Sequence, residues 1–185
     1  MSDFEVHTKE TAPTESAQHL ASAEKAYGFI PNLLGMIAES PATLGAYLSI
    51  GQQFEQSFFS VIERQIIMLT TSRFNECDYC MAAHSVIAGM QAVPNDVIEA
   101  LRNDQPIDDC RLEALRVFTS KVVEKRGHMS GADIAAFLAV GYTNAQVLDV
   151  IFGVSFKTLS NYVNHVAETQ LDDVFATQAW VPIVD

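Results

Sequence analysis

The chain of 185 residues is predicted to fold as one all-α domain. Three observations support this class. Apolar residues recur at helical spacing, Ser, Thr and Asp stand in capping positions before several of these segments, and no segment shows strand alternation bounded by hairpin turns. The apolar share of 49% is enough to form a hydrophobic core in a chain of this length.

Start and stop signals in the sequence give the expected boundaries of each helix. Residues 1–15 are polar and lack periodicity, so we expect a flexible N-terminal arm ahead of a single domain over residues 16–185. Gly28 stops the first helix, Ser40 and Pro41 supply an N-cap and a proline at N1 for the third, and Ser60 with Glu63 forms a capping box. The expected helices cover residues 16–27, 33–39, 40–56, 60–74, 78–90, a short segment from 94, a long one from 108 or 109 to 127, and two that begin at Ser130 and Thr143.

Composition and charge exclude several classes of function. The 23 acidic and 11 basic residues give a formal charge of −12, which repels phosphate backbones and anionic lipid, so we expect neither nucleic acid nor membrane as a partner. The best apolar stretch, residues 147–156, is interrupted by Asp149 and Gly153 and is too short to span a bilayer. Three cysteines do not make a secreted disulfide framework, and the first residues lack the features of a signal peptide, so we expect a cytoplasmic protein.

The most informative motif reads Cys77-Asp78-Tyr79-Cys80-Met81-Ala82-Ala83-His84. Two thiols at this spacing can close a disulfide. If a helix begins near Cys77, then Cys80 and His84 share one face of it, and the positive end of the helix dipole favours a thiolate at Cys80. The motif therefore predicts thiol redox chemistry at Cys80.

The cysteines have two other interpretations. Cys77, Cys80 and His84 could supply three zinc ligands, but no second CxxC or HxxxH completes a structural site, and we expect no metal. Coincidental buried cysteines are the other alternative. A thioredoxin-like domain is disfavoured because residues 61–74, upstream of the motif, are predicted to be helical rather than a strand.

The motif resembles the carboxymuconolactone decarboxylase and AhpD-like alkylhydroperoxidase superfamily, in its peroxidase-related branch. The matching residues are Glu63 on the preceding helix and Asn75-Glu76-Cys77-Asp78-Tyr79-Cys80-Met81-Ala82-Ala83-His84, with weaker echoes at residues 28–32 and 161–165. The resemblance extends over about residues 27–175. It implies an all-α, homo-oligomeric fold that reduces small hydroperoxides through the CxxC pair, without metal, haem or flavin.

The same resemblance implies a role for each member of the motif. Cys80 is the peroxidatic thiol, which becomes a sulfenic acid, and Cys77 is the resolving thiol, which then closes a disulfide. An external dithiol reduces that disulfide. His84 is expected to orient or deprotonate Cys80.

The sequence departs from the family pattern at the acid of the proton relay. The position twelve residues before the first cysteine, a glutamate in the best-studied members, is Gln65 here. Glu63 lies about 200° around the helix from Gln65, and its capping role beside Ser60 is at least as plausible as a catalytic one. Tyr79 occupies a position that is histidine in some relatives, and it is a much weaker acid-base group near neutral pH.

The sequence also bears on two residues outside the motif and on two alternative functions. His165 is expected to be structural rather than part of the site, and Cys110 to be unreactive because it follows two aspartates. A dithiol-exchange or redox-sensing protein is the main alternative to a peroxidase. Decarboxylation of a muconolactone-type acid ranks third, with Arg64 and Arg73 as the nearby candidates to bind an anionic substrate.

Overall fold

The computed structural model describes residues 4–182, and within that range the chain is helical and contains no strand. The elements are α1 (Thr14–Tyr27), α2 (Asn32–Ile37), α3 (Pro41–Glu55), α4 (Val61–Phe74), α5 (Asp78–Met90), α6 (Asn95–Arg102), α7 (Cys110–Glu124), α8 (Gly131–Ala139), α9 (Asn144–Ala167) and the 3-10 helix η1 (Asp173–Gln178). The predicted all-α class is confirmed.

The helix boundaries follow the capping signals closely. The side chains of Ser40, Ser60 and Thr143 accept hydrogen bonds from the backbone at the starts of α3, α4 and α9, as predicted. The first helix begins at Thr14 rather than Ser16, because the carbonyl of Pro13 already accepts the first helical hydrogen bonds. The 3-10 helix η1 was not predicted, and its short segment carries no capping residue that makes a side-chain bond.

The N-terminal arm contacts the body of the protein within the described residues. The backbone amide of His7 donates to the carbonyl of Gly35, at 3.2 Å, and the His7 ring lies 2.6 Å from a carboxylate oxygen of Glu39. These contacts hold part of the arm against α2 and the residues that follow it.

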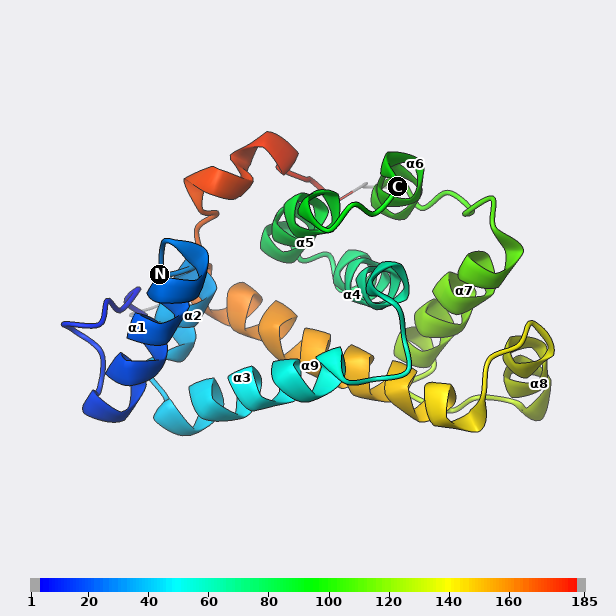
Figure 1. Cartoon of the computed structure of the whole chain (residues 1–185), viewed down its shortest axis with the longest axis horizontal. Helices are drawn as coiled ribbons and strands as arrows, with labels where there is room; N and C mark the ends of the chain where they lie inside the picture. Colours follow the sequence, from blue (N-terminus) through cyan, green and yellow to red (C-terminus); the bar gives the residue numbers. More distant parts are fainter. Residues whose placement is uncertain (1–3, 183–185) are drawn as a thin grey trace.

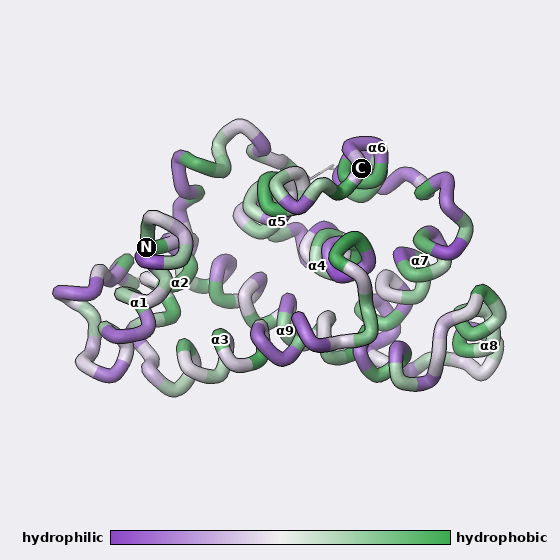
Figure 2. The backbone as a smooth tube through the Cα atoms, viewed as in Figure 1, coloured by the Kyte–Doolittle hydropathy of each residue, from purple (hydrophilic) through white to green (hydrophobic). Residues whose placement is uncertain are grey.

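Helix α4 lies at the centre of the molecule and packs against α5, α7 and α9 (Figure 1). In that view α4 and α5 are seen nearly end-on, whereas α3 and α9 run side by side across the page. Hydrophobic and hydrophilic residues alternate along α9 (Figure 2), as expected for a helix that buries one face. Segment η1 passes over α5 on the opposite side from α9.

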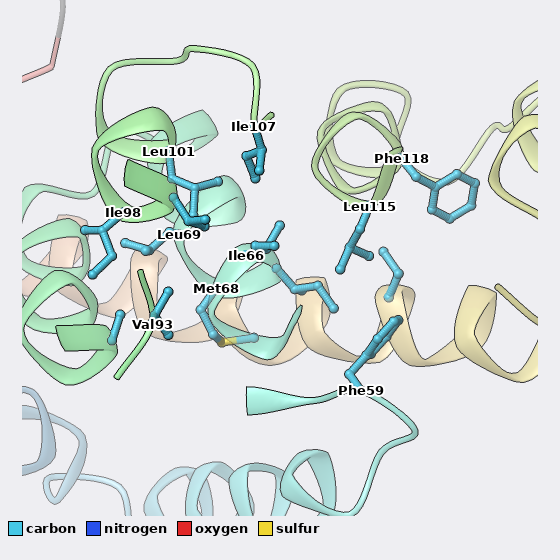
Figure 3. Packing of buried hydrophobic residues seen from close by; sticks show 14 of the residues in the cluster. Phe59, Ile66, Met68, Leu69, Val93, Ile98, Leu101, Ile107, Leu115 and Phe118 are labelled. Carbon is cyan, nitrogen blue, oxygen red and sulfur yellow. The ribbon is translucent and has the colours of Figure 1, made fainter. Parts of the chain in front are cut away.

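Two clusters of buried hydrophobic residues form the core. In the larger one, side chains of α4, α6 and α7 converge, among them Leu69, Leu101 and Leu115 (Figure 3). The smaller cluster joins α1, α2, α3 and η1 to the first half of α5, and it contains both Cys77 and Cys80. The thiols are thus enclosed in a hydrophobic core.

A close helix crossing positions the polar residues that face these thiols. A Cβ atom at Gly153 of α9 would lie 2.7 Å from the ring of Phe54 and 2.8 Å from Ile67. Only glycine allows α9 to approach α3 and α4 this closely. Lys157, one turn further along α9, is thereby brought into the interior.

No single helix among residues 4–182 is both long and apolar enough to cross a membrane. The pair α8 and α9, bent by 110° at their junction, meets the length and composition requirements only when taken together.

Candidate active site

The CxxC motif lies at the start of α5, as predicted. Cys77 is the N-cap residue and Cys80 lies in the first turn. Both are free thiols, with side chains 0% and 1% exposed. Access to either sulfur therefore requires a small reagent or a local opening of the fold.

One face of α9 lines the thiols with polar side chains, all of them buried. The residues are Lys157, Ser160, Asn161 and Asn164, whose spacing of three, four and seven places them on the same side of the helix. The Asn164 Nδ2 donates to Cys80 Sγ at 3.2 Å and lies 3.6 Å from Cys77 Sγ, while Cys80 Sγ is 3.9 Å from Ser160 Oγ.

Lys157 is the cation of the site. Its side chain is 1% exposed, and its Nζ lies 2.9 Å from His84 Nε2. Burial acts to lower the pKa of Lys157, but the neighbouring Cys80, Tyr47 and Cys77 together outweigh it and raise that pKa, so the amine stays protonated. A buried ammonium is costly without a partner, and here the partner is the sulfur of Cys80.

The two thiols have opposite acidities. Burial acts to raise the pKa of Cys80, but the hydrogen bond from Cys77 and the charge of Lys157 outweigh it and lower that pKa to about 5. The pKa of Cys77 is raised, first because its thiol is hydrogen-bonded to Cys80 and second because it is buried. Cys80 is therefore a thiolate near neutral pH, with Cys77 as a protonated donor beside it.

His84 is linked to Cys80 through Lys157. Its Nδ1 is 3.0 Å from Gln65 Oε1 and its Nε2 is 2.9 Å from Lys157 Nζ. Burial and the charge of Lys157 lower the pKa of His84 well below its ordinary value, so the ring is neutral. A neutral ring between these partners donates from Nδ1 to Gln65 and accepts at Nε2 from Lys157.

Gln65 continues the hydrogen-bonded chain toward the surface. Its Nε2 donates to Gln91 Oε1 at 2.9 Å, and Gln91 is exposed at the end of α5. The chain thus runs from Gln91 through Gln65, His84 and Lys157 to Cys80. Gln65 has the place that the family pattern gives to a carboxylate.

The backbone arrangement was compared with known proteins. No protein-family model and no curated protein sequence matched the chain. Among solved structures, an alkylhydroperoxidase AhpD core, an uncharacterized peroxidase-related protein from Ralstonia eutropha JMP134, is 24% identical over 97% of both chains, with a TM-score of 0.85. A peroxidase-related protein from Silicibacter sp. TM1040 is 20% identical over 96% of this chain and 94% of that one, with a TM-score of 0.82. This chain has the AhpD-like fold.

A third solved structure with a similar fold belongs to an enzyme with a different substrate. The debrominase Bmp8, solved with 2,3,4-tribromopyrrole in a cysteine-to-alanine variant, is 15% identical over 96% of both chains, with a TM-score of 0.81. The fold expected from the CxxC resemblance is thus confirmed, and the fold alone does not fix the substrate.

Glu63 points away from the thiols of the AhpD-like core. Its carboxylate accepts from the backbone and hydroxyl of Ser60, both at 2.8 Å, and from Arg111 at 2.6 Å. Burial acts to raise the pKa of Glu63, but the hydrogen bonds from Ser60 and the charge of Arg111 lower it. The angular separation from Gln65 predicted this divergence, and the contacts are those of a helix cap.

Tyr79, between the two cysteines, ties α5 to two other segments. Its hydroxyl donates to Asp172 Oδ2 at 2.6 Å and accepts from the amide of Leu33 at 3.4 Å. Burial and the Asp172 carboxylate raise the pKa of Tyr79, so it stays protonated at neutral pH. These contacts position the first turn of α5.

Several other predicted candidates lie away from the thiols. His165 is exposed and packs near the Tyr162 ring, and Cys110 is exposed at the start of α7. Arg64 donates to the carbonyl of Phe59, and Arg73 pairs with Asp104 at 3.3 Å.

A cavity of about 130 Å³ lies beside the start of α5, lined by Asp78, Tyr79, Thr169, Leu171, Ala179 and Trp180.

No group of three or more His, Cys, Asp or Glu side chains in residues 4–182 is placed to hold a metal ion. His84, which the zinc interpretation would need beside both thiols, faces Gln65 and Lys157 instead.

Sequence reasoning singled out residues 161–165 without giving Asn161 or Asn164 a role, and it missed the other residues that surround Cys80 from α3 and α9. Lys157 is the clearest omission, because it is the only lysine or arginine between residues 144 and 167, in a largely apolar helix. Such a lone basic residue was a usable signal. Tyr47 of α3, which is hydrogen-bonded to Ser160, and Gln91 carried no comparable signal.

Proposed function

We propose that this protein is a thiol-dependent hydroperoxide reductase of the AhpD-like superfamily, with Cys80 as its peroxidatic residue. One observation carries the proposal: the Cys80 sulfur is buried beside the Lys157 ammonium, with the pKa of Cys80 lowered to about 5. Cys77, three residues earlier in the chain, remains protonated and is hydrogen-bonded to Cys80. A thiolate with a neighbouring thiol is the arrangement that peroxide reduction requires.

The reaction follows in two balanced steps. The Cys80 thiolate attacks the terminal oxygen of ROOH, an S–O bond forms, the O–O bond breaks, and the alkoxide takes a proton from Lys157 to leave as ROH. Cys77 then attacks the Cys80 sulfenic sulfur, and the departing hydroxide takes the Cys77 proton to leave as water. An external dithiol reduces the resulting disulfide, and Lys157 regains its proton as Cys80 becomes a thiolate again.

The buried site favours this reaction over the two alternatives. Dithiol exchange as the main activity needs a sulfur that another protein can reach, whereas both sulfurs here are enclosed and a small peroxide reaches them more easily. The dithiol that completes the peroxidase cycle must likewise be small or reach the disulfide through a local opening of the fold. Binding an anionic lactone needs a free cation, yet Arg64 and Arg73 are engaged elsewhere and Lys157 is paired with Cys80.

Peroxide consumption tests the proposal. The protein is assayed with hydrogen peroxide and tert-butyl hydroperoxide in the presence of a dithiol, beside the Cys80→Ser, Cys77→Ser and Cys110→Ser variants. We expect turnover in the unsubstituted protein and in Cys110→Ser, and its loss in the other two. A bromopyrrole is assayed in parallel, because one protein of the same fold is a debrominase. Debromination without peroxide turnover would replace the proposed reaction.

A further inference from the structure

The carboxamide of Asn164 has one satisfied end and one unsatisfied end. Its Nδ2 donates to Cys80 Sγ at 3.2 Å, with Cys77 Sγ at 3.6 Å. Its Oδ1 is buried and lacks a hydrogen-bond partner among the described residues, and the whole residue is 5% exposed. The Asn164 oxygen is therefore an unpaired acceptor held next to the reacting sulfur.

An unpaired buried acceptor is costly enough to need an explanation. Leaving such a group unsatisfied costs about 1–3 kcal/mol, and native proteins hold few of them. The neighbours of Asn164 do not satisfy it: the Cys77 proton is directed to Cys80, and the Ser160 hydroxyl donates to the Lys157 carbonyl. The missing partner must carry an O–H or N–H group and fit against Cys80.

We propose that Asn164 is the binding residue for the hydroxyl of the hydroperoxide. The Asn164 Oδ1 accepts the O–H of the terminal peroxide oxygen, while Asn164 Nδ2 holds the Cys80 sulfur that attacks this same oxygen. The inference rests on the proposed peroxidase function and deepens it, because it selects peroxides that keep a free O–H.

The same acceptor serves the product of the first step. When the Cys80 sulfur forms its bond to the terminal oxygen and the O–O bond breaks, the hydroxyl proton stays on the transferred oxygen. The resulting Cys80 sulfenic acid therefore presents its O–H to Asn164 Oδ1. Cys77 remains free to attack the sulfenic sulfur, and the proton for the departing alkoxide still comes from Lys157.

A ratio of two rates tests this role. The loss of the Cys80 thiolate is followed in single-turnover reactions with tert-butyl hydroperoxide, which carries an O–H, and with methyl methanethiosulfonate, which does not. Both are measured in a Cys77→Ser, Cys110→Ser background. We expect Asn164→Leu to lower the peroxide rate about tenfold more than the thiosulfonate rate, since a neutral hydrogen bond to substrate is lost.

Controls separate this role from a structural one. Asn144→Leu, at an exposed asparagine on the same helix, is expected to leave both rates unchanged. Asn164→Ala removes the same two atoms without adding a larger apolar side chain, and serves where the leucine variant does not fold. Equal slowing of both reactions would assign Asn164 only to thiolate stabilisation and overturn the inference. If the protein with Asn164 intact fails to react with peroxide at all, the proposed function is wrong as well, and its own reaction with peroxide shows this directly.

Discussion

Lys157, which is buried, and His84, which is half-buried, share a hydrogen bond of 2.9 Å from Nζ to Nε2 beside the Cys80 thiolate. The neutral His84 ring accepts this bond because its other nitrogen donates to Gln65. Lys157 therefore stands between an imidazole that can receive its proton and a sulfur that needs its charge. The acidity of Cys80 therefore depends on the hydrogen bond from Cys77 and on the charge of Lys157, and on His84 through Lys157.

Replacing the Lys157 cation should raise the pKa of the Cys80 thiol. We expect Lys157→Met to move the pKa of Cys80 from about 5 toward its ordinary value of 9.0, because the favourable charge is lost and burial is not. Thiolate ultraviolet absorbance against pH measures this in a Cys110→Ser background. Lys121→Met, which removes a surface lysine paired with Asp133, is the control and should leave the titration unchanged. An unshifted pKa in Lys157→Met would remove Lys157 from the activation of Cys80.

Restoring a carboxylate at the relay position should strengthen the base. In Gln65→Glu a negative charge beside Nδ1 raises the pKa of His84, so the ring can hold a proton and return it to Lys157 after Lys157 has protonated the alkoxide. We expect faster peroxidase turnover near neutral pH, declining as the solution is acidified and the new carboxyl is protonated. Gln91→Glu adds the same charge one hydrogen bond further from His84 and should have a smaller effect. Steady-state rates against pH compare the two variants with the unsubstituted protein. A Gln65→Glu enzyme that is slower than the unsubstituted protein would contradict the relay.

Glu63 should affect stability and not chemistry. Glu63→Gln keeps a capping side chain but loses the charged bond to Arg111, so we expect a loss of about 1 kcal/mol in the free energy of unfolding. Urea denaturation measures this loss. The alkylation rate of Cys80 should be unchanged in the same variant. A folded Glu63→Gln protein with a slow Cys80 would show that the carboxylate reaches the site after all.

The outer face of α9 is expected to form a contact between copies of the chain. Its exposed apolar residues are Leu148, Ile151, Tyr162 and Val166, whose spacing places them in one stripe. Light scattering at micromolar concentration should therefore give a mass of at least two chains, each of 20.3 kDa. The double variant Ile151→Asp, Tyr162→Asp should shift the protein toward that single-chain mass. A wild-type protein that is already monomeric would refute the contact.

The local elements were predictable because their signals are local. The capping boxes at Ser60 and Thr143 and the position of Cys77 at a helix start follow from residues within a few positions of each other. The opposite directions of Glu63 and Gln65 followed from helical geometry alone. By contrast, the bond between Lys157 and His84 joins residues 73 positions apart, and it depends on the close approach of α9 at Gly153. No spacing rule within one helix contains that information.

The most direct test of the central claim is to trap the oxidised sulfur. The Cys77→Ser and Cys80→Ser variants, both in a Cys110→Ser background, are treated with one equivalent of hydrogen peroxide in the presence of dimedone, and the adduct is located by mass spectrometry. We expect the sulfenic acid adduct on Cys80 when Cys77 is replaced, and little or none on Cys77 when Cys80 is replaced. An adduct that forms readily on Cys77 in the Cys80→Ser variant, while Cys80 stays unmodified in the Cys77→Ser variant, would contradict the assignment of the reacting thiol.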